Sequence, residues 1–460
     1  MSQPAQPATR LSLSTILAFA AGGLPISGLN IAMAISVQPY FAQSLGVGLV
    51  PLALAFFWVR ILDLGVDLLL AVIMDRTRTP IGRYRAWMVL GAPVLMLGVY
   101  QLFMAKKGIG VGYLIVWLLV YAFGSSIVTL SRNAWSANLV TRYDQRSRFY
   151  GYLGLVQVIG VLIVLGTPIV SQAVGKGFHL PNSVQLMGWA TLALIPLCTV
   201  VTTGLVREPI TVDAAAPRFE LREYWALATK PEVLRIFFSQ FALTLGPGWM
   251  ANLYLFFFIA ARGFTEGPAY GLLIVYVLAG VLGAPLIGYL GGRFGKHRTL
   301  LAATLCYSAG LCTVMIVPKA DFWLTLPVML WCGLMANGFD LMTSAMMADV
   351  GDQVRLEQGK ERMALLFAVI SLAQKLAAAG AVIIAYPLLA LAGYDPKLAG
   401  HNTPAALNGL QLVFILGPIF WVVLGGLCFL GWKLDATRHA EIRAELEARD
   451  ALIASRGAIL

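Results

Sequence analysis

Twelve apolar stretches, each long enough to cross a lipid bilayer, dominate this sequence. A transmembrane helix needs about 20 mostly apolar residues. The stretches lie at 11–37, 47–74, 86–105, 111–141, 149–174 and 185–206, and then at 233–261, 267–291, 299–318, 322–348, 363–393 and 406–433. Of the 460 residues, 59% are hydrophobic and only 12% are charged, which argues strongly against a soluble domain. The sequence predicts an all-α polytopic membrane protein.

The longest polar connection separates the stretches into two sets of six. We therefore expect four parts: an N-terminal six-helix bundle at 1–206, a cytoplasmic connecting loop at 207–232, a C-terminal six-helix bundle at 233–434 and a cytoplasmic helical tail at 435–460. Opposite charges at helical spacing predict the helix in the tail. We interpret it as a solvated or membrane-surface helix, and a partner-binding tail is the alternative.

The placement of basic residues predicts the orientation. A formal net charge of +11 would also suit a nucleic-acid-binding protein. However, 24 of the 33 Lys and Arg residues fall in segments assigned to the cytoplasm, three lie within spans, and six lie outside. This positive-inside pattern predicts a membrane protein with both termini in the cytoplasm, surrounded by a lipid bilayer and not bound to nucleic acid. We expect the membrane to be the bacterial inner membrane.

Little in the sequence suggests an enzyme. The five cysteines all fall in apolar stretches, without the spacing of a disulfide framework or a metal site. The four histidines lie far apart in loops or in the tail, and we find no nucleotide-binding loop. We therefore expect neither a metal site nor a cofactor.

Two carboxylates lie inside the second apolar stretch. Asp63 and Asp67 are four residues apart, so on a helix they share one face about one turn apart. Carboxylates are costly in lipid and normally face a bundle interior or an aqueous cavity, where they mark an ion or substrate path. An uncoupled channel or facilitator has no need of such a pair.

The surroundings of this pair resemble a known transporter family. Arg60, Asp63 and Asp67 match the Arg-x-x-Asp-x-x-x-Asp element of the glycoside-pentoside-hexuronide:cation symporters, which belong to the major facilitator superfamily. The turn from Asp75 to Arg85 matches the D-R-T-x-T-x-x-G-R-x-R loop of that family. The resemblance implies a major facilitator fold of two pseudo-symmetric six-helix bundles, with cation binding by Asp63 and Asp67. Residues assigned to a charge or gating network here are Arg60, Asp75, Arg83 and Arg85.

The two halves of the chain also share a short sequence pattern. GRYR at Gly82 to Arg85 recurs after the eighth stretch as GRFGKHR at Gly292 to Arg298. Such weak internal symmetry is expected when two similar bundles enclose a site near the bilayer midplane.

The fourth stretch contains a buried cation next to polar and aromatic residues. Arg132 must find a carboxylate, water or an anionic ligand at this depth. Asn133 and Trp135 are of the kind that line polyol sites. The Arg132 guanidinium is expected to reach toward Asp63 or Asp67, either as part of a coupling cycle or only as a structural ion pair.

Several positions depart from the family pattern. The resemblance places the two sugar-binding carboxylates of the family at Ser27 and Ser131, which weakens a galactoside-type substrate. Val66 and Val128 replace an amide and a hydroxyl of the cation site, which favours H+ over Na+. The candidate substrate-binding residues are Ser27, Ser131, Arg132, Asn133, Trp135 and Lys375.

The second half carries further charged candidates. Asp349 and Asp352 resemble the family's loop between spans ten and eleven, and Gln374 with Lys375 matches its Gln-Lys pair. Lys375 lies well inside its apolar stretch and could neutralise an aspartate across the cavity. Asp340 either pairs with Lys375 or lies at a wet edge. We add Asp340, Asp349 and Asp352 to the charge network.

The sequence thus predicts a monomeric secondary transporter that works by alternating access. Its expected activity is symport of a small-molecule sugar, glycoside or uronide with a cation. Two alternatives stay open: a carrier of a lysophospholipid or other amphipathic anion, and a non-coupled facilitator.

Overall fold

The computed structural model describes residues 12–139, 143–174, 182–208, 227, 229–359 and 362–457, and the secondary structure in these residues is helical. Within the helices, the side chain of Asp75 falls outside the described set. Contacts between Cα atoms divide the chain into two compact units, Met1–Ala216 and Pro217–Leu460. Each unit is described by itself.

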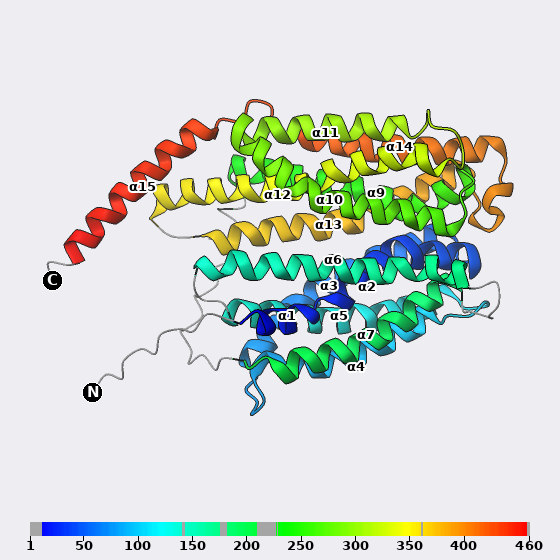
Figure 1. Ribbon diagram of the computed structural model, residues 1–460, viewed down its shortest axis with the longest axis horizontal. Coiled ribbons are helices and arrows are strands. Elements are labelled where there is room, and N and C mark those ends of the chain that lie inside the picture. Colours follow the sequence, from blue (N-terminus) through cyan, green and yellow to red (C-terminus); the bar gives the residue numbers. More distant parts are fainter. Residues whose placement is uncertain are drawn as a thin grey trace. The chain divides into compact units, whose positions relative to one another are not determined.

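The first unit contains six long helical segments (Figure 1). The first segment is built from α1 (Leu13–Ala21), α2 (Leu24–Ala32) and the π-helical turns η1 (Met33–Val37) and η2 (Tyr40–Ser44). The other five are α3 (Leu49–Arg76), α4 (Arg83–Phe103), α5 (Val111–Leu139), α6 (Tyr143–Val174) and α7 (Ser183–Leu205).

The first segment is interrupted between α1 and α2. Gly22 and Gly23 stand at the break, and Pro25 lies in the first turn of α2, where its missing N–H costs nothing. The break lets the chain change direction inside a span that the hydropathy pattern shows as continuous.

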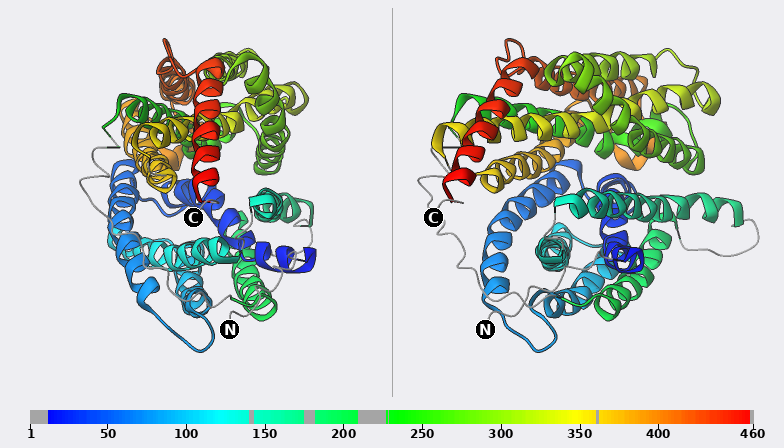
Figure 2. Two further views of the ribbon diagram at one scale, coloured as in Figure 1. Left: turned by 90° about the vertical axis from the view of Figure 1, so that its left-hand side faces the viewer. Right: turned by 60° about the vertical axis from the view of Figure 1, so that its left-hand side comes forward.

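The second unit repeats this plan. Its six long segments are α9 (Pro231–Leu255), which continues as η3 (Phe256–Ala261), then α10 (Glu266–Phe294), α11 (Lys296–Thr313), α12 (Phe322–Gln358), α13 (Met363–Leu391) and α14 (Pro404–Leu427). The short 3₁₀ helix η4 (Pro396–His401) joins the last two. The tail forms α15 (Ala436–Gly457), which lies across one end of this unit in both views of Figure 2.

Ten of the described helices are long and apolar enough to cross a membrane. The two remaining long helices are α3, which carries charged residues within its apolar run, and α11, which begins with Lys296, His297 and Arg298. Together these helices make the twelve of the predicted fold, six in each unit. The predicted all-α class with two six-helix bundles is confirmed.

The tenth span is longer than its apolar stretch. The stretch ends at 348, but α12 continues to Gln358 and stops at Gly359, whose φ of +68° gives a left-handed cap. Asp349 and Asp352 were expected in a loop, and this expectation is wrong because both lie on the last turns of α12. The residues after 348 are polar, so the apolar stretch ends there, but they still favour a helical backbone and the helix continues.

The tail helix is not wholly solvated. Ile442 and Leu446, one turn apart on α15, are both buried. His439 and Arg443 lie on the same part of α15 and contact α12, as described below. The tail therefore packs with one face against the second unit.

Candidate substrate and coupling site

The carboxylate pair lies where α3 packs against α5. Asp63 and Asp67 are both half-buried on α3. The Ser126 hydroxyl of α5 donates a hydrogen bond of 2.8 Å to Asp63 Oδ1. Ser126 was not among the sequence candidates, although two adjacent serines in an apolar stretch are a usable signal. Arg60, one turn earlier on α3, is exposed.

Arg132 of α5 is a buried cation. The residue is 7% exposed, and its Nε and Nη1 atoms have no hydrogen-bond partner in the part of the chain that the structure describes. Nη1 lies against the glycine break of the first segment, since a Cβ atom on Gly23 would be only 2.1 Å from it. Burying a guanidinium is costly unless an anion or water satisfies it.

The expected approach of Arg132 to Asp63 or Asp67 is wrong, because no ion pair joins these residues within the described part of the chain. The guanidinium is instead accommodated by Gly23. Ser126, which does contact Asp63, precedes Arg132 by six residues, or about 9 Å along a helix and on another face. The aspartate pair and the arginine are therefore two separate polar sites in the first unit.

Arg132 lines a small cavity of about 190 Å³. The lining comes from α1, α5 and α6 and comprises Phe19, Arg132, Asn133, Ser136, Tyr150, Leu153, Gly154 and Gln157. Amide, hydroxyl and guanidinium groups thus converge next to an aromatic ring. This combination suits a small polar ligand that carries negative charge.

The other candidates of the first unit have supporting positions. Trp135 is fully buried and packs edge-on against Phe19, with ring centroids 5.3 Å apart, so it supports the cavity wall. The Ser131 hydroxyl donates to the Val128 carbonyl of its own helix at 3.1 Å. The Ser27 hydroxyl donates to the Gln157 carbonyl at 2.7 Å and so ties α2 to α6.

In the second unit, Asp340 is held by two glutamines. Its Oδ1 atom accepts hydrogen bonds from Gln374 Nε2 of α13 at 2.6 Å and from Gln240 Nε2 of α9 at 3.2 Å. The Thr343 hydroxyl in turn donates to Gln240 Oε1, which orients the amide. Asp340 therefore pairs with amides and not with Lys375, which lies half-buried on α13.

Asp349 and Asp352 belong to a charge network at the end of α12. Lys296 Nζ, in the first turn of α11, lies 2.7 Å from both carboxylate oxygens of Asp349. His439 Nε2 lies 3.1 Å from Asp352 Oδ2 and 3.3 Å from Asp349 Oδ1. Arg443 Nη1 adds a contact of 3.7 Å to Asp352. The network joins α11, α12 and the tail helix.

Glu208 holds the basic turn before α4 in place, and it was not among the residues predicted from the sequence. The Glu208 carboxylate accepts three backbone N–H bonds, from Arg83 at 3.1 Å, Tyr84 at 3.0 Å and Arg85 at 2.9 Å. These are donors that the start of α4 cannot satisfy internally. Gly82 permits the approach, because it has a φ of +113° and its missing Cβ would clash with Glu208.

The chain is similar in sequence to a known transporter family and to several known proteins. Residues 18–436 match the MFS/sugar transport protein family. An uncharacterized symporter, YnaJ, of Bacillus subtilis (strain 168) is 22% identical over 89% of each chain. The raffinose carrier protein of Pediococcus pentosaceus and the lactose permease of Leuconostoc lactis are each 21% identical, over 84% and 85% of this chain. The chain spans 63% of the length of these two proteins.

Solved structures share the fold. The nucleoside transporter NupG matches with a TM-score of 0.66 at 14% identity, over 92% of this chain and 100% of that one. A bacterial homolog of the human lysosomal transporter Spinster, inward-facing and unoccupied, matches with a TM-score of 0.60 at 12% identity, over 95% and 97%. The sequence resemblance to major facilitator symporters is confirmed. The chain belongs to the MFS/sugar transport protein family and is an integral membrane transporter, not an enzyme.

Proposed function

We propose that the protein is an H+-coupled symporter of a sugar, glycoside or uronide, and that a uronide fits its site best. It works by alternating access in a bacterial inner membrane, with both termini in the cytoplasm. Relatives named raffinose carrier protein and lactose permease support a sugar substrate, and a relative named symporter supports coupled transport. The 24 basic residues in predicted cytoplasmic segments, against six outside, support the orientation.

The observation that carries the uronide assignment is the buried guanidinium of Arg132. Its Nε and Nη1 atoms lack hydrogen-bond partners among the described residues, in a cavity that also offers Asn133 and Gln157. A carboxylate pairs with a guanidinium through two parallel charge-assisted hydrogen bonds. The amides are then available for ring hydroxyls.

The residues that replace the family's sugar carboxylates also favour an anionic substrate. Ser27 and Ser131 carry no charge, and their hydroxyls donate to backbone carbonyls. A neutral galactoside would lose both of the acceptors that the family resemblance assigns to it. A uronide brings its own carboxylate and instead needs the cation that Arg132 supplies.

Proton coupling is supported by the surroundings of the aspartate pair. A proton needs a single carboxylate oxygen, whereas a hard metal cation takes several oxygen ligands. The Ser126 hydroxyl approaches Asp63, but Val66 contributes only hydrocarbon at a position where the family resemblance expects an amide. In this proposal, Arg132 binds the substrate carboxylate, and Asp63 or Asp67, with which Arg132 forms no ion pair among the described residues, takes up the proton.

A second candidate substrate is an amphipathic anion such as a lysophospholipid. Phe19 and Leu153 give the Arg132 cavity an apolar side, which is compatible with an acyl chain next to the cation. Arg132 would pair with the anionic group of either substrate, so a comparison of ligands is needed to distinguish the two candidates.

The test is thermal unfolding of the purified protein with glucuronate and galacturonate glycosides, neutral glycosides and lysophospholipids. A ligand that binds only the folded state raises Tm. We expect uronides to raise the Tm of the wild type but not of Arg132→Gln, and Arg293→Gln serves as a charge-matched control. Stabilisation by neutral glycosides, equal in wild type and Arg132→Gln, would contradict the uronide assignment. Stabilisation by lysophospholipids alone would establish the second candidate.

A further inference from the structure

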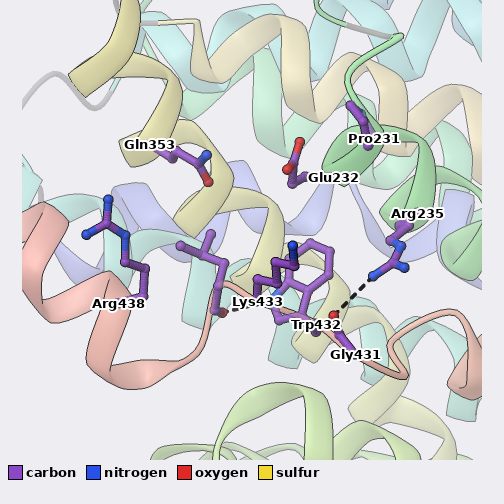
Figure 3. Close-up of a pocket in the computed structure, with 9 residues that line it drawn as sticks. Pro231, Glu232, Arg235, Gln353, Gly431, Trp432, Lys433 and Arg438 are labelled. Carbon is purple, nitrogen blue, oxygen red and sulfur yellow. Dashed lines mark hydrogen bonds between the residues drawn. The ribbon is translucent and has the colours of Figure 1, made fainter.

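The second unit contains a larger cavity that the transport site does not use. Its volume is about 610 Å³, and it lies at the end of the unit where α9 begins and α14 ends. The polar lining consists of Glu232 and Arg235 of α9, Gln353 of α12, Trp432 and Lys433 of the segment that leads into α15, and Arg438 of α15. Figure 3 shows Arg235 and Arg438 on opposite sides of this pocket.

Three cations face one anion in this pocket. Arg438 donates to Glu441 at 2.7 Å, so its charge is already paired outside the pocket. Lys433 makes no hydrogen bond or ion pair within the described residues. Arg235 has a single long contact there, from Nη1 to the Gly431 carbonyl at 3.5 Å (Figure 3). Most donors of Arg235 and Lys433 are therefore available to a ligand.

Two carboxylates could neutralise these cations: Glu232 in the lining and Glu357 beside it. Within the described residues, no ion pair joins Glu232 to Arg235 or Lys433. Glu357 lies 2.5 Å from Lys230 and accepts a hydrogen bond of 2.9 Å from Gln353. Partial burial raises the pKa of Glu357, but the hydrogen bonds from Lys230 and Gln353 outweigh it and hold the pKa below its ordinary value. Glu357 is thus an ionised partner of Lys230, which leaves Arg235 and Lys433 without it.

The segment after α14, which carries Lys433, is held in place by contacts within the segment. The chain leaves α14 through Gly431, whose φ of +70° needs a glycine. The Trp432 indole N–H donates to the Leu434 carbonyl at 2.8 Å, and its ring packs edge-on against Phe429 at 5.1 Å. Such contacts preorganise a site, because fewer side-chain rotamers need to be frozen when a ligand binds.

Exposed apolar side chains lead directly up to this polar pocket. Leu234 and Phe238 lie one turn apart on α9, beside Arg235, and Leu430 precedes Gly431 after α14. In a membrane transporter, exposed residues of this kind face lipid acyl chains. Basic pockets between helices at the cytoplasmic side of a membrane suit anionic headgroups.

We propose that this pocket binds the phosphate of an anionic phospholipid headgroup. Arg235 provides a guanidinium fork for two phosphate oxygens, and Lys433 provides a point charge. The acyl chains lie along Leu234, Phe238 and Leu430. A soluble phosphate compound presents the same headgroup chemistry without the acyl chains, so the experiment includes both sources.

The test uses the delipidated full-length protein in neutral detergent, titrated with phosphatidylglycerol, phosphatidylcholine or inorganic phosphate. Binding is measured by native mass spectrometry and by the shift in Tm. We expect phosphatidylglycerol to bind and to raise Tm, and we expect the other two to do neither. Arg235→Gln and Lys433→Gln should each weaken phosphatidylglycerol binding about tenfold, since each removes a charge-assisted hydrogen bond.

Two controls separate this site from general charge effects. Arg293→Gln removes one positive charge from the last turn of α10, in the same unit, and should bind like the wild type. Arg235→Lys keeps the charge and should retain most of the affinity, and gel filtration confirms that every variant is folded. Equal weakening in Arg293→Gln would overturn the site. Inorganic phosphate that binds as well as phosphatidylglycerol and competes with it would overturn the lipid assignment.

Discussion

The Ser126 hydroxyl on α5 donates a hydrogen bond of 2.8 Å to the Asp63 carboxylate on α3. This contact positions the first member of the carboxylate pair at a helix–helix interface and gives it a polar partner inside an apolar run. A carboxylate in a membrane span is costly, so its presence there indicates a function. The contact places the proposed coupling site between α3 and α5.

Replacement of either aspartate tests whether the pair couples transport. Asp63→Asn and Asp67→Asn should abolish uphill accumulation while substrate exchange continues, because a permanently neutral side chain cannot take up and release a proton. Uptake into proteoliposomes with an imposed gradient, compared with counterflow, measures the two activities. Ser125→Ala, next to the proposed contact, is the control. The pair would be structural if both Asn variants still concentrated substrate.

Substitution at Gly23 tests the position of Arg132 without removing its charge. A Cβ atom on Gly23 would lie 2.1 Å from Arg132 Nη1, so Gly23→Ala should displace the guanidinium and weaken binding of an anionic substrate. Arg132→Met should also abolish binding but should not lower Tm, since it removes an unpaired buried charge. Unchanged substrate affinity in Gly23→Ala would show that the observed guanidinium position is not the binding one.

The Glu208 cap makes a prediction about stability. Glu208→Ala leaves the N–H groups of Arg83, Tyr84 and Arg85 without their carboxylate, which should cost about 1 kcal/mol. The free energy of unfolding should fall by this amount, and Tm should fall with it. Arg207→Ala, at the adjacent position, is the matched control. If both variants had the same Tm as the wild type, the cap would contribute nothing measurable.

Much of the fold could be predicted because bilayer length and positive-inside charge act on whole segments. Details of the helices depended on local chemistry that hydropathy does not report. The first span breaks at Gly22 and Gly23, and α12 continues to Gln358 through polar residues that still favour a helix. Periodicity correctly placed Asp63 and Asp67 on one face of α3.

The partners of the site residues were harder to predict, because they come from other helices. Nothing near Asp63 in the sequence indicates Ser126, and nothing near Asp340 indicates Gln240, one hundred residues away. The expected reach of Arg132 toward the aspartates failed for a related reason. Nothing near Arg132 in the sequence indicates Gly23, the residue of another segment against which the guanidinium lies.

Cysteine accessibility tests the predicted topology. In a variant without the five native cysteines, Ala215→Cys lies in the connecting segment and should be protected from impermeant reagents in intact cells. Lys107→Cys, in a turn predicted to lie outside, should react. Labelling of Ala215→Cys, together with protection of Lys107→Cys, would require the opposite orientation.

The most direct test of proton-coupled uronide symport is uptake into proteoliposomes under one imposed gradient at a time. A uronide that stabilises the purified protein is supplied outside, with either an inward pH gradient and no Na+ or an inward Na+ gradient at equal pH. We predict accumulation with the pH gradient, its loss on addition of a protonophore, and its absence in Asp63→Asn. Accumulation driven by Na+ at equal pH and unaffected by protonophore would contradict proton coupling.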